Sequence, residues 1–178
     1  LRNGQVQSAH PRVPLAMTHP VALGDALLAA LVSTRPHYRR YLFLHQLVHK
    51  LAHRFPAREG RDVVLVSLME HHSNDLPWRC ANKVIHIGTR PNGSLDEDEF
   101  DRILKEYGKR IALVSISGAS NVTGFINPIH RLAEKTHQIG AQIAVDCAQL
   151  APHRKIKVGS LDDPAHLDYI FISGHKMY

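Results

Sequence analysis

Four short polar runs in the chain carry side chains that could do chemistry. Each follows an apolar run of about the length of a β-strand, and in chain order they are Glu70–Asn74, Ser120–Gly124, Asp146–Gln149 and Ser173–Met177. In open α/β sheets, ligands bind beyond the carboxyl ends of the strands. The four runs would therefore converge on one ligand and offer it an imidazole, an amide, a carboxylate and a primary amine.

This set of groups predicts a pyridoxal phosphate site. Such a site needs a lysine that forms a Schiff base with the cofactor and an acid at the pyridinium nitrogen, with further contacts to the ring and the phosphate. Lys176 and Asp146 are the candidate amine and carboxylate. Taken singly, a lysine or an aspartate after a strand is more often a surface residue, a cap or part of a turn, so the prediction depends on all four runs.

Five runs of β-like sequence predict the strands that would position these residues. They are Val63–Leu68, Lys83–Ile87, Ile111–Ser117, Gln142–Val145 and Tyr169–Ile172. A capping box at Ser94–Glu97 predicts a helix to Tyr107 that stops at Gly108, and Asn127-Pro128 opens a helix that Gly140 closes. Alternating strands and helices indicate an α/β fold with three α/β/α layers and a mainly parallel sheet.

The chain before the first strand has two parts. Residues 1–36 hold four prolines and little periodicity, so we expect an irregular N-terminal segment there. Between residues 38 and 55, apolar side chains recur at the spacing of three and four that is typical of one helix face. We expect residues 37–178 to form one domain, which the length of 178 residues allows.

Composition argues against several other classes of protein. No run of about 20 apolar residues predicts a membrane span. The net charge is +6, but Lys and Arg are scattered without a basic stripe, so no nucleic-acid partner is expected. The 14 histidines form no H-E-x-x-H motif, and no metal site is predicted. Only two cysteines, Cys80 and Cys147, favour a reducing compartment, and we expect the cytoplasm.

The polar runs also resemble a known family. E-H-H-S-N-x-x-P-W, S-N-V-T-G, V-D-x-A-Q and S-G-H-K-M occur in this order between Val63 and Tyr178. They resemble the class V aminotransferases, which are fold-type I pyridoxal-phosphate enzymes, and especially their cysteine desulfurase-like branch. The resemblance implies that the sheet is part of the large, cofactor-binding domain of that family. It also implies a homodimer and a small amino acid as substrate.

The resemblance implies roles for three residues at the reacting centre. Lys176 would form the internal aldimine with pyridoxal 5'-phosphate and then move the α-proton of the substrate. Asp146 would pair with the pyridinium nitrogen and keep it protonated, so that the ring acts as an electron sink. His71 would stack on the ring and assist in proton transfer.

Four further residues would bind the cofactor by the same resemblance. Gln149 and Asn121 would donate toward its phenolic oxygen or the neighbourhood of that atom, although amides in turns often only form the turn. Ser173 and His175 would bind the phosphate. Cys147 stands where other members often carry a small residue, and we interpret it as a packing residue.

The sequence departs from the family pattern at two places. Residues 33–38 contain one Ser, one Thr and no Gly, whereas the family carries a Gly/Ser/Thr-rich phosphate loop before the corresponding helix. The sequence ends two residues after Lys176, so we expect the small C-terminal domain, with its substrate-binding arginine and the sulfur-accepting cysteine of desulfurases, to be missing. Two hypotheses stay open: an enzyme of desulfuration, transamination or elimination, or a catalytically inactive fragment of this fold.

Overall fold

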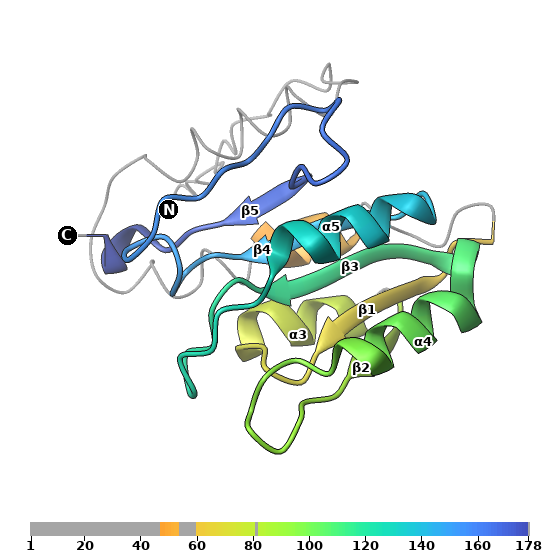
Figure 1. Cartoon of the computed structure of the whole chain (residues 1–178), viewed down its shortest axis with the longest axis horizontal. Coiled ribbons are helices and arrows are strands. Elements are labelled where there is room, and N and C mark those ends of the chain that lie inside the picture. The colour runs from red at the N-terminus through yellow and green to blue at the C-terminus, as the bar shows by residue number, and fades with distance from the viewer. Residues whose placement is uncertain (1–46, 54–59, 81, 178) are drawn as a thin grey trace, which may run out of the picture.

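A five-stranded parallel sheet forms the centre of the protein (Figure 1). The computed structural model describes residues 47–53, 60–80 and 82–177, except the side chain of His175. The spatial order of the strands is β2-β1-β3-β4-β5. Their bounds are β1 Val63–Ser67, β2 Lys83–Ile87, β3 Ile111–Ser117, β4 Gln142–Asp146 and β5 Tyr169–Phe171.

The strands lie where the apolar runs predicted them. β2 and β3 have the predicted bounds, β1 and β5 end one residue earlier, and β4 extends by one residue to include Asp146. All five residues of β1 are buried, as are six of the seven in β3. A strand that is buried on both faces is mostly apolar, because neither row of its alternating side chains meets water.

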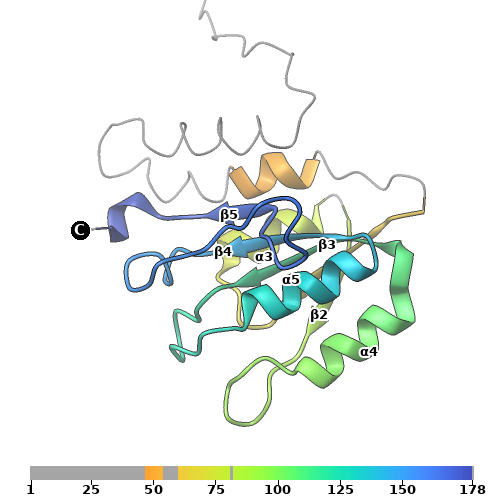
Figure 2. The same ribbon diagram turned by 45° about the horizontal axis from the view of Figure 1, so that its top comes forward.

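Helices cover both faces of this sheet, and alternate residues of β1 show which helix covers which face (Figure 2). Val63 and Leu65 pack in one core with side chains of α4 (Glu97–Tyr107) and α5 (Ile129–Gln138). Val64 and Val66 pack in a second core with the helical segment 47–53 and with Trp78 of α3 (His72–Arg79). These layers confirm the predicted three-layer α/β/α architecture with a mainly parallel sheet.

The start of α4 differs from the predicted capping box. The N-cap is Asp96, whose side chain accepts hydrogen bonds from the backbone amides of Asp98 (3.1 Å) and Glu99 (3.2 Å). Ser94 instead donates from its hydroxyl to Asn92 (2.8 Å) in the preceding turn. The prediction of Ser94 as cap was wrong because Asp96 and Glu99 repeat the same three-residue spacing two positions later. The helix ends at Tyr107 before Gly108, as predicted.

Helix α5 lies where Asn127-Pro128 and Gly140 predicted it. α5 begins after Pro128 and ends one residue before Ile139, and Gly140 follows at a φ of 70°, where glycine is favoured. Helix α3 was not predicted. The irregular segment 1–36 and the first part of the helix expected from residue 38 lie outside the described residues.

Candidate functional site

Three of the four polar runs follow β3, β4 and β5 and therefore lie together at the carboxyl ends of the strands. The parallel register pairs Asp146, the last residue of β4, with Ser117 of β3 on one side and with Phe171 of β5 on the other. The backbone continues this alignment for one more residue, since the Cys147 amide donates to the Phe171 carbonyl at 2.7 Å. Residues 173–176 follow β5 at the same end of the sheet.

Asp146 is a buried carboxylate, with 5% of its surface exposed. Its Oδ1 accepts a hydrogen bond from the Ala148 amide at 2.9 Å. Burial raises the pKa of Asp146, whereas the hydrogen bond from Ala148 and the positive charge of Lys176 act to lower it, as a charge on His71 would. In the described part of the chain no hydrogen bond occupies Oδ2, so the group is suited to a cationic partner.

Lys176 is the last residue of a single 3-10 turn, Gly174–Lys176, that follows β5. Its amide donates to the Ser173 carbonyl at 3.0 Å, which fixes the turn, and its side chain is half-buried. The charge of its amine acts on Asp146, so the amine and the carboxylate share one electrostatic environment. Ser173 is half-buried at the start of this turn.

His71 is the N-cap of α3. Its Nδ1 accepts a hydrogen bond from the Ser73 amide at 3.2 Å, and Ser73 Oγ lies at 2.9 Å from the same nitrogen. An Nδ1 that accepts from a backbone amide leaves the ring proton on Nε2. The histidine is exposed, so this Nε2–H is available to a ligand over the edge of the sheet.

Glu70 is part of the site and was not predicted. Its carboxylate accepts hydrogen bonds from the Ser67 hydroxyl, from Asn74 Nδ2 (2.6 Å), and from both the amide (2.6 Å) and the hydroxyl (2.7 Å) of Ser117. Asn74 in turn accepts from Ser115 at 2.8 Å. Burial raises the pKa of Glu70 to about 7, although all four donors act to lower it. The network ties the ends of β1 and β3 to α3 directly beside His71.

The side-chain amides of Asn121 and Gln149 belong to turns that follow β3 and β4. Asn121 is exposed, in a turn closed by the bond from the Gly124 amide to the Ser120 carbonyl (3.1 Å). Gln149 is half-buried in the turn after β4. The side chain of His175 and the predicted gap in the phosphate loop at residues 33–38 lie outside the described residues.

The two cysteines are free thiols in different surroundings. Cys147 is buried, and burial together with the charge of Asp146 raises its pKa to about 12. A thiol with such a pKa stays protonated and unreactive at neutral pH, in agreement with a packing role. Cys80, which follows α3, is exposed.

The comparison with protein families decides the family of this chain. Residues 45–178 match the family model described as aminotransferase class-V. The chain belongs to this family. The match includes every residue of the site described above, and the resemblance that the four motifs indicated is confirmed.

Curated relatives agree with this assignment. The chain is 36% identical over 128 residues to a probable cysteine desulfurase of Xylella fastidiosa (strain 9a5c), which covers 69% of this chain and 29% of that protein. It is 36% identical over 122 residues to a cysteine desulfurase of Enterobacter sp. (strain 638), covering 66% and 28%. The chain therefore spans less than a third of the length of these relatives.

Solved structures support the fold. An apo cysteine desulfurase from Thermococcus onnurineus NA1 has a TM-score of 0.61 and 24% identity, over 89% of this chain and 39% of that one. The cysteine desulfurase CsdA from Escherichia coli has a TM-score of 0.57 and 22% identity, over 88% and 47%. Among the described residues, no helix is long and apolar enough to cross a membrane.

Proposed function

We propose that this chain carries the pyridoxal-phosphate site of a cysteine desulfurase-like class V aminotransferase that acts on a small amino acid. The observation that supports the proposal most strongly is Asp146. It is buried, its Oδ2 is free of hydrogen bonds within the described chain, and the charge of Lys176 acts on it. A buried carboxylate of this kind suits the protonated ring nitrogen of the cofactor.

Each residue of the site would then have a defined task. Asp146 would hold a proton on the ring nitrogen, and Lys176 would bind the cofactor through its amine and carry the proton at the α-carbon of the substrate. His71 would cover the ring with its imidazole. When bound, the cofactor supplies an electron sink for the bonds at that α-carbon.

The remaining predicted residues would bind the periphery of the cofactor. Gln149 and Asn121 would donate toward the phenolic oxygen, and Ser173 and His175 would donate to the phosphate. Glu70 would keep α3 and the imidazole of His71 at a fixed height over the sheet edge, since it bonds to both β3 and α3.

The names of the curated relatives favour cysteine desulfuration over transamination or another elimination. A second copy of the chain is part of the proposal. Three apolar side chains in the loop after β3 support such a partner, because they are widely exposed: Val122 (84%), Phe125 (38%) and Ile126 (45%). Two free thiols support a reducing compartment such as the cytoplasm.

A catalytically inactive version of this fold is the alternative. The exposure of both His71 and Asn121 is the observation in its favour, because side chains that hold a cofactor ring are usually enclosed.

An absorbance titration with pyridoxal phosphate tests the proposal. We expect the chain to acquire the visible band of a lysine-bound cofactor, and borohydride to trap the cofactor on Lys176, as peptide mapping would show. Lys176→Ala should abolish both signals, and Lys155→Ala, at an exposed lysine, should leave both unchanged. A folded sample without a band, or label spread over several lysines, would reject the site and favour the inactive alternative.

A further inference from the structure

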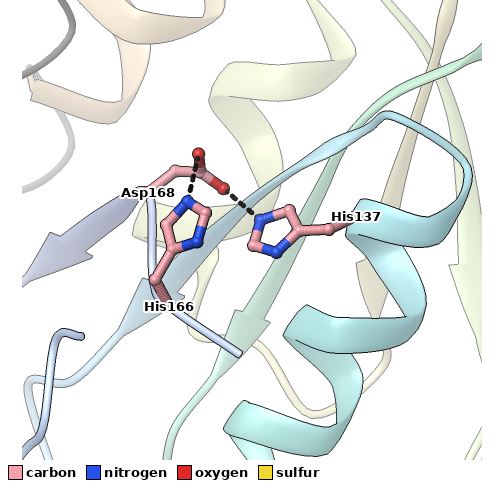
Figure 3. Close-up of side chains that lie close together, drawn as sticks. All are labelled: His137, His166 and Asp168. Atoms are coloured by element: carbon pink, nitrogen blue, oxygen red, sulfur yellow. Dashed lines mark hydrogen bonds and ion pairs between the residues drawn. The ribbon is translucent and has the colours of Figure 1, made fainter. Parts of the chain in front are cut away.

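A second cluster of polar side chains lies at the opposite end of the sheet, where the strands begin. It consists of His137 near the end of α5, and of His166 and Asp168 in the segment that leads into β5 (Figure 3). Asp168 directly precedes β5, whereas Lys176 follows that strand. The cluster therefore lies at the amino ends of β4 and β5, away from Asp146.

Hydrogen bonds to the backbone fix the tautomer of both histidines. Nδ1 of His137 lies 2.6 Å from the carbonyl oxygen of Pro164, and Nδ1 of His166 lies 2.7 Å from that of Asp163. A carbonyl oxygen only accepts, so each Nδ1 must carry a proton. In the neutral form of either ring, Nε2 then carries no proton and presents a lone pair.

Both of these lone pairs face the same carboxylate (Figure 3). Nε2 of His137 is 2.9 Å from Asp168 Oδ2, and Nε2 of His166 is 3.4 Å from Asp168 Oδ1. Two lone pairs against an ionised carboxylate repel each other, so the cluster needs positive charge between these atoms. Protons on the rings or one divalent cation would supply it.

The surroundings favour a single cation over two protons. The side chains of His137, His166 and Asp168 are only 16%, 14% and 11% exposed. The two rings lie nearly parallel, with centroids 4.2 Å apart. Two protonated rings would put like charges face to face in a poorly solvated place against one carboxylate, and such charges are costly to bury.

The outer hydrogen bonds of the cluster follow the pattern that is typical of metal sites. Histidine ligands of metals almost always donate their other ring N–H to a carbonyl or a carboxylate, and ligating carboxylates are themselves hydrogen-bonded. Both rings here donate to carbonyls, and Asp168 accepts from the Ile143 amide (2.8 Å) and from Gln142 Nε2 (3.3 Å). All three candidate ligands are therefore oriented by a second partner.

We propose that His137, His166 and Asp168 bind a Zn²⁺ ion. Imidazole and carboxylate ligands suit zinc, and three protein ligands leave its fourth position for water. In a tetrahedral site with zinc–nitrogen bonds of roughly 2.0–2.1 Å, ligand atoms lie roughly 3.3 Å apart, and here all three lie within 4.8 Å of one another. The rings, now inclined by 17°, must turn about their Cβ–Cγ bonds to meet one ion, so zinc should widen that angle.

The ion would fasten the segment before β5 to helix α5. This inference does not depend on the proposed function, because the cluster shares no residue with the cofactor site. Zinc would act there as a structural clamp and would raise the free energy of unfolding with the logarithm of one plus its concentration over its dissociation constant.

Zinc titration of the whole chain after treatment with a chelator tests the proposal. We expect one tightly bound equivalent by calorimetry, a rise in melting temperature with Zn²⁺ and none with Mg²⁺. His137→Gln and His166→Gln should each weaken that equivalent by more than about 100-fold, since loss of an outer partner alone costs about 10- to 100-fold. His130→Gln is the matched control, because this ring binds the Ala165 carbonyl (2.9 Å) in the same segment but lies outside the cluster.

Ring nitrogen NMR of the unsubstituted chain keeps the test decisive if a variant does not fold. Zinc should shift the Nε2 signals of His137 and His166 and leave their Nδ1 protonated. Unchanged zinc affinity in both variants would show that other histidines bind the metal and would overturn the proposal. Two rings that stay doubly protonated in the presence of zinc would overturn it in favour of protons.

Discussion

Glu70 makes the stability of this protein depend on pH in a direction that is unusual for a carboxylate. Its pKa rises from an ordinary value of 4.5 to about 7 on burial. The folded state therefore binds the proton more tightly than the unfolded state does. The contribution of Glu70 is fully present below about pH 4.5 and is lost as the pH rises through 7. At about 1.4 kcal/mol per tenfold change in proton affinity, the loss amounts to about 3 kcal/mol.

Urea unfolding of the chain between pH 5 and pH 8 measures this effect. Histidines also titrate in that range, so the matched variant is Glu70→Gln, which keeps the shape of the side chain and cannot ionise. We expect the variant to be less stable at pH 5, because an amide nitrogen would face Asn74 Nδ2, a donor. The difference in unfolding free energy between parent and variant should shrink by about 3 kcal/mol toward pH 8. A difference that stays constant over this range would refute the reasoning.

Four further predictions concern single residues. Asp96→Ala should lower the free energy of unfolding by about 1 kcal/mol, as measured by urea unfolding, because it removes the cap of α4. Leu132→Ala, in the core under α5, should cost about 2–5 kcal/mol in the same assay. Asp146→Asn should weaken pyridoxal phosphate binding in an absorbance titration, and equal affinity would argue against its pairing with the ring nitrogen. Cys80 should react quickly with a disulfide reagent because it is exposed, whereas the buried Cys147 should react slowly.

The strands could be predicted because each is a short run of mostly apolar or β-branched residues bounded by polar turns. Helix α3 was missed for a physical reason. Its buried residues include Asn74 and Asp75, and Pro77 lies inside it, so it shows no apolar periodicity. Its start gave no signal either, because its N-cap is His71 and an imidazole is not among the usual N-cap side chains.

The parts of the site that follow from topology were predictable, and those that need tertiary contacts were not. The order of the strands alone brings Asp146 and the turn of Lys176 together at the carboxyl ends of β4 and β5. Glu70 meets Ser117 across 47 positions of sequence, and His137 meets Asp168 across 31. No spacing rule links residues so far apart, so only the folded chain shows the hydrogen bonds of Glu70 and the cluster of His137, His166 and Asp168.

The short strand β5 determines how firmly Lys176, the lysine proposed to bind the cofactor, is held. Only three residue pairs join it to β4, and in the described sheet it lies at the edge, with one side unpaired. Segments with few backbone bonds open at a small fraction of the global unfolding free energy. Amide hydrogen exchange should therefore be fastest among the strands in β5 and slowest in β3. We therefore expect the turn that carries Lys176 to open together with β5. A ligand or a neighbouring chain bound there would spend part of its binding free energy on holding that turn closed.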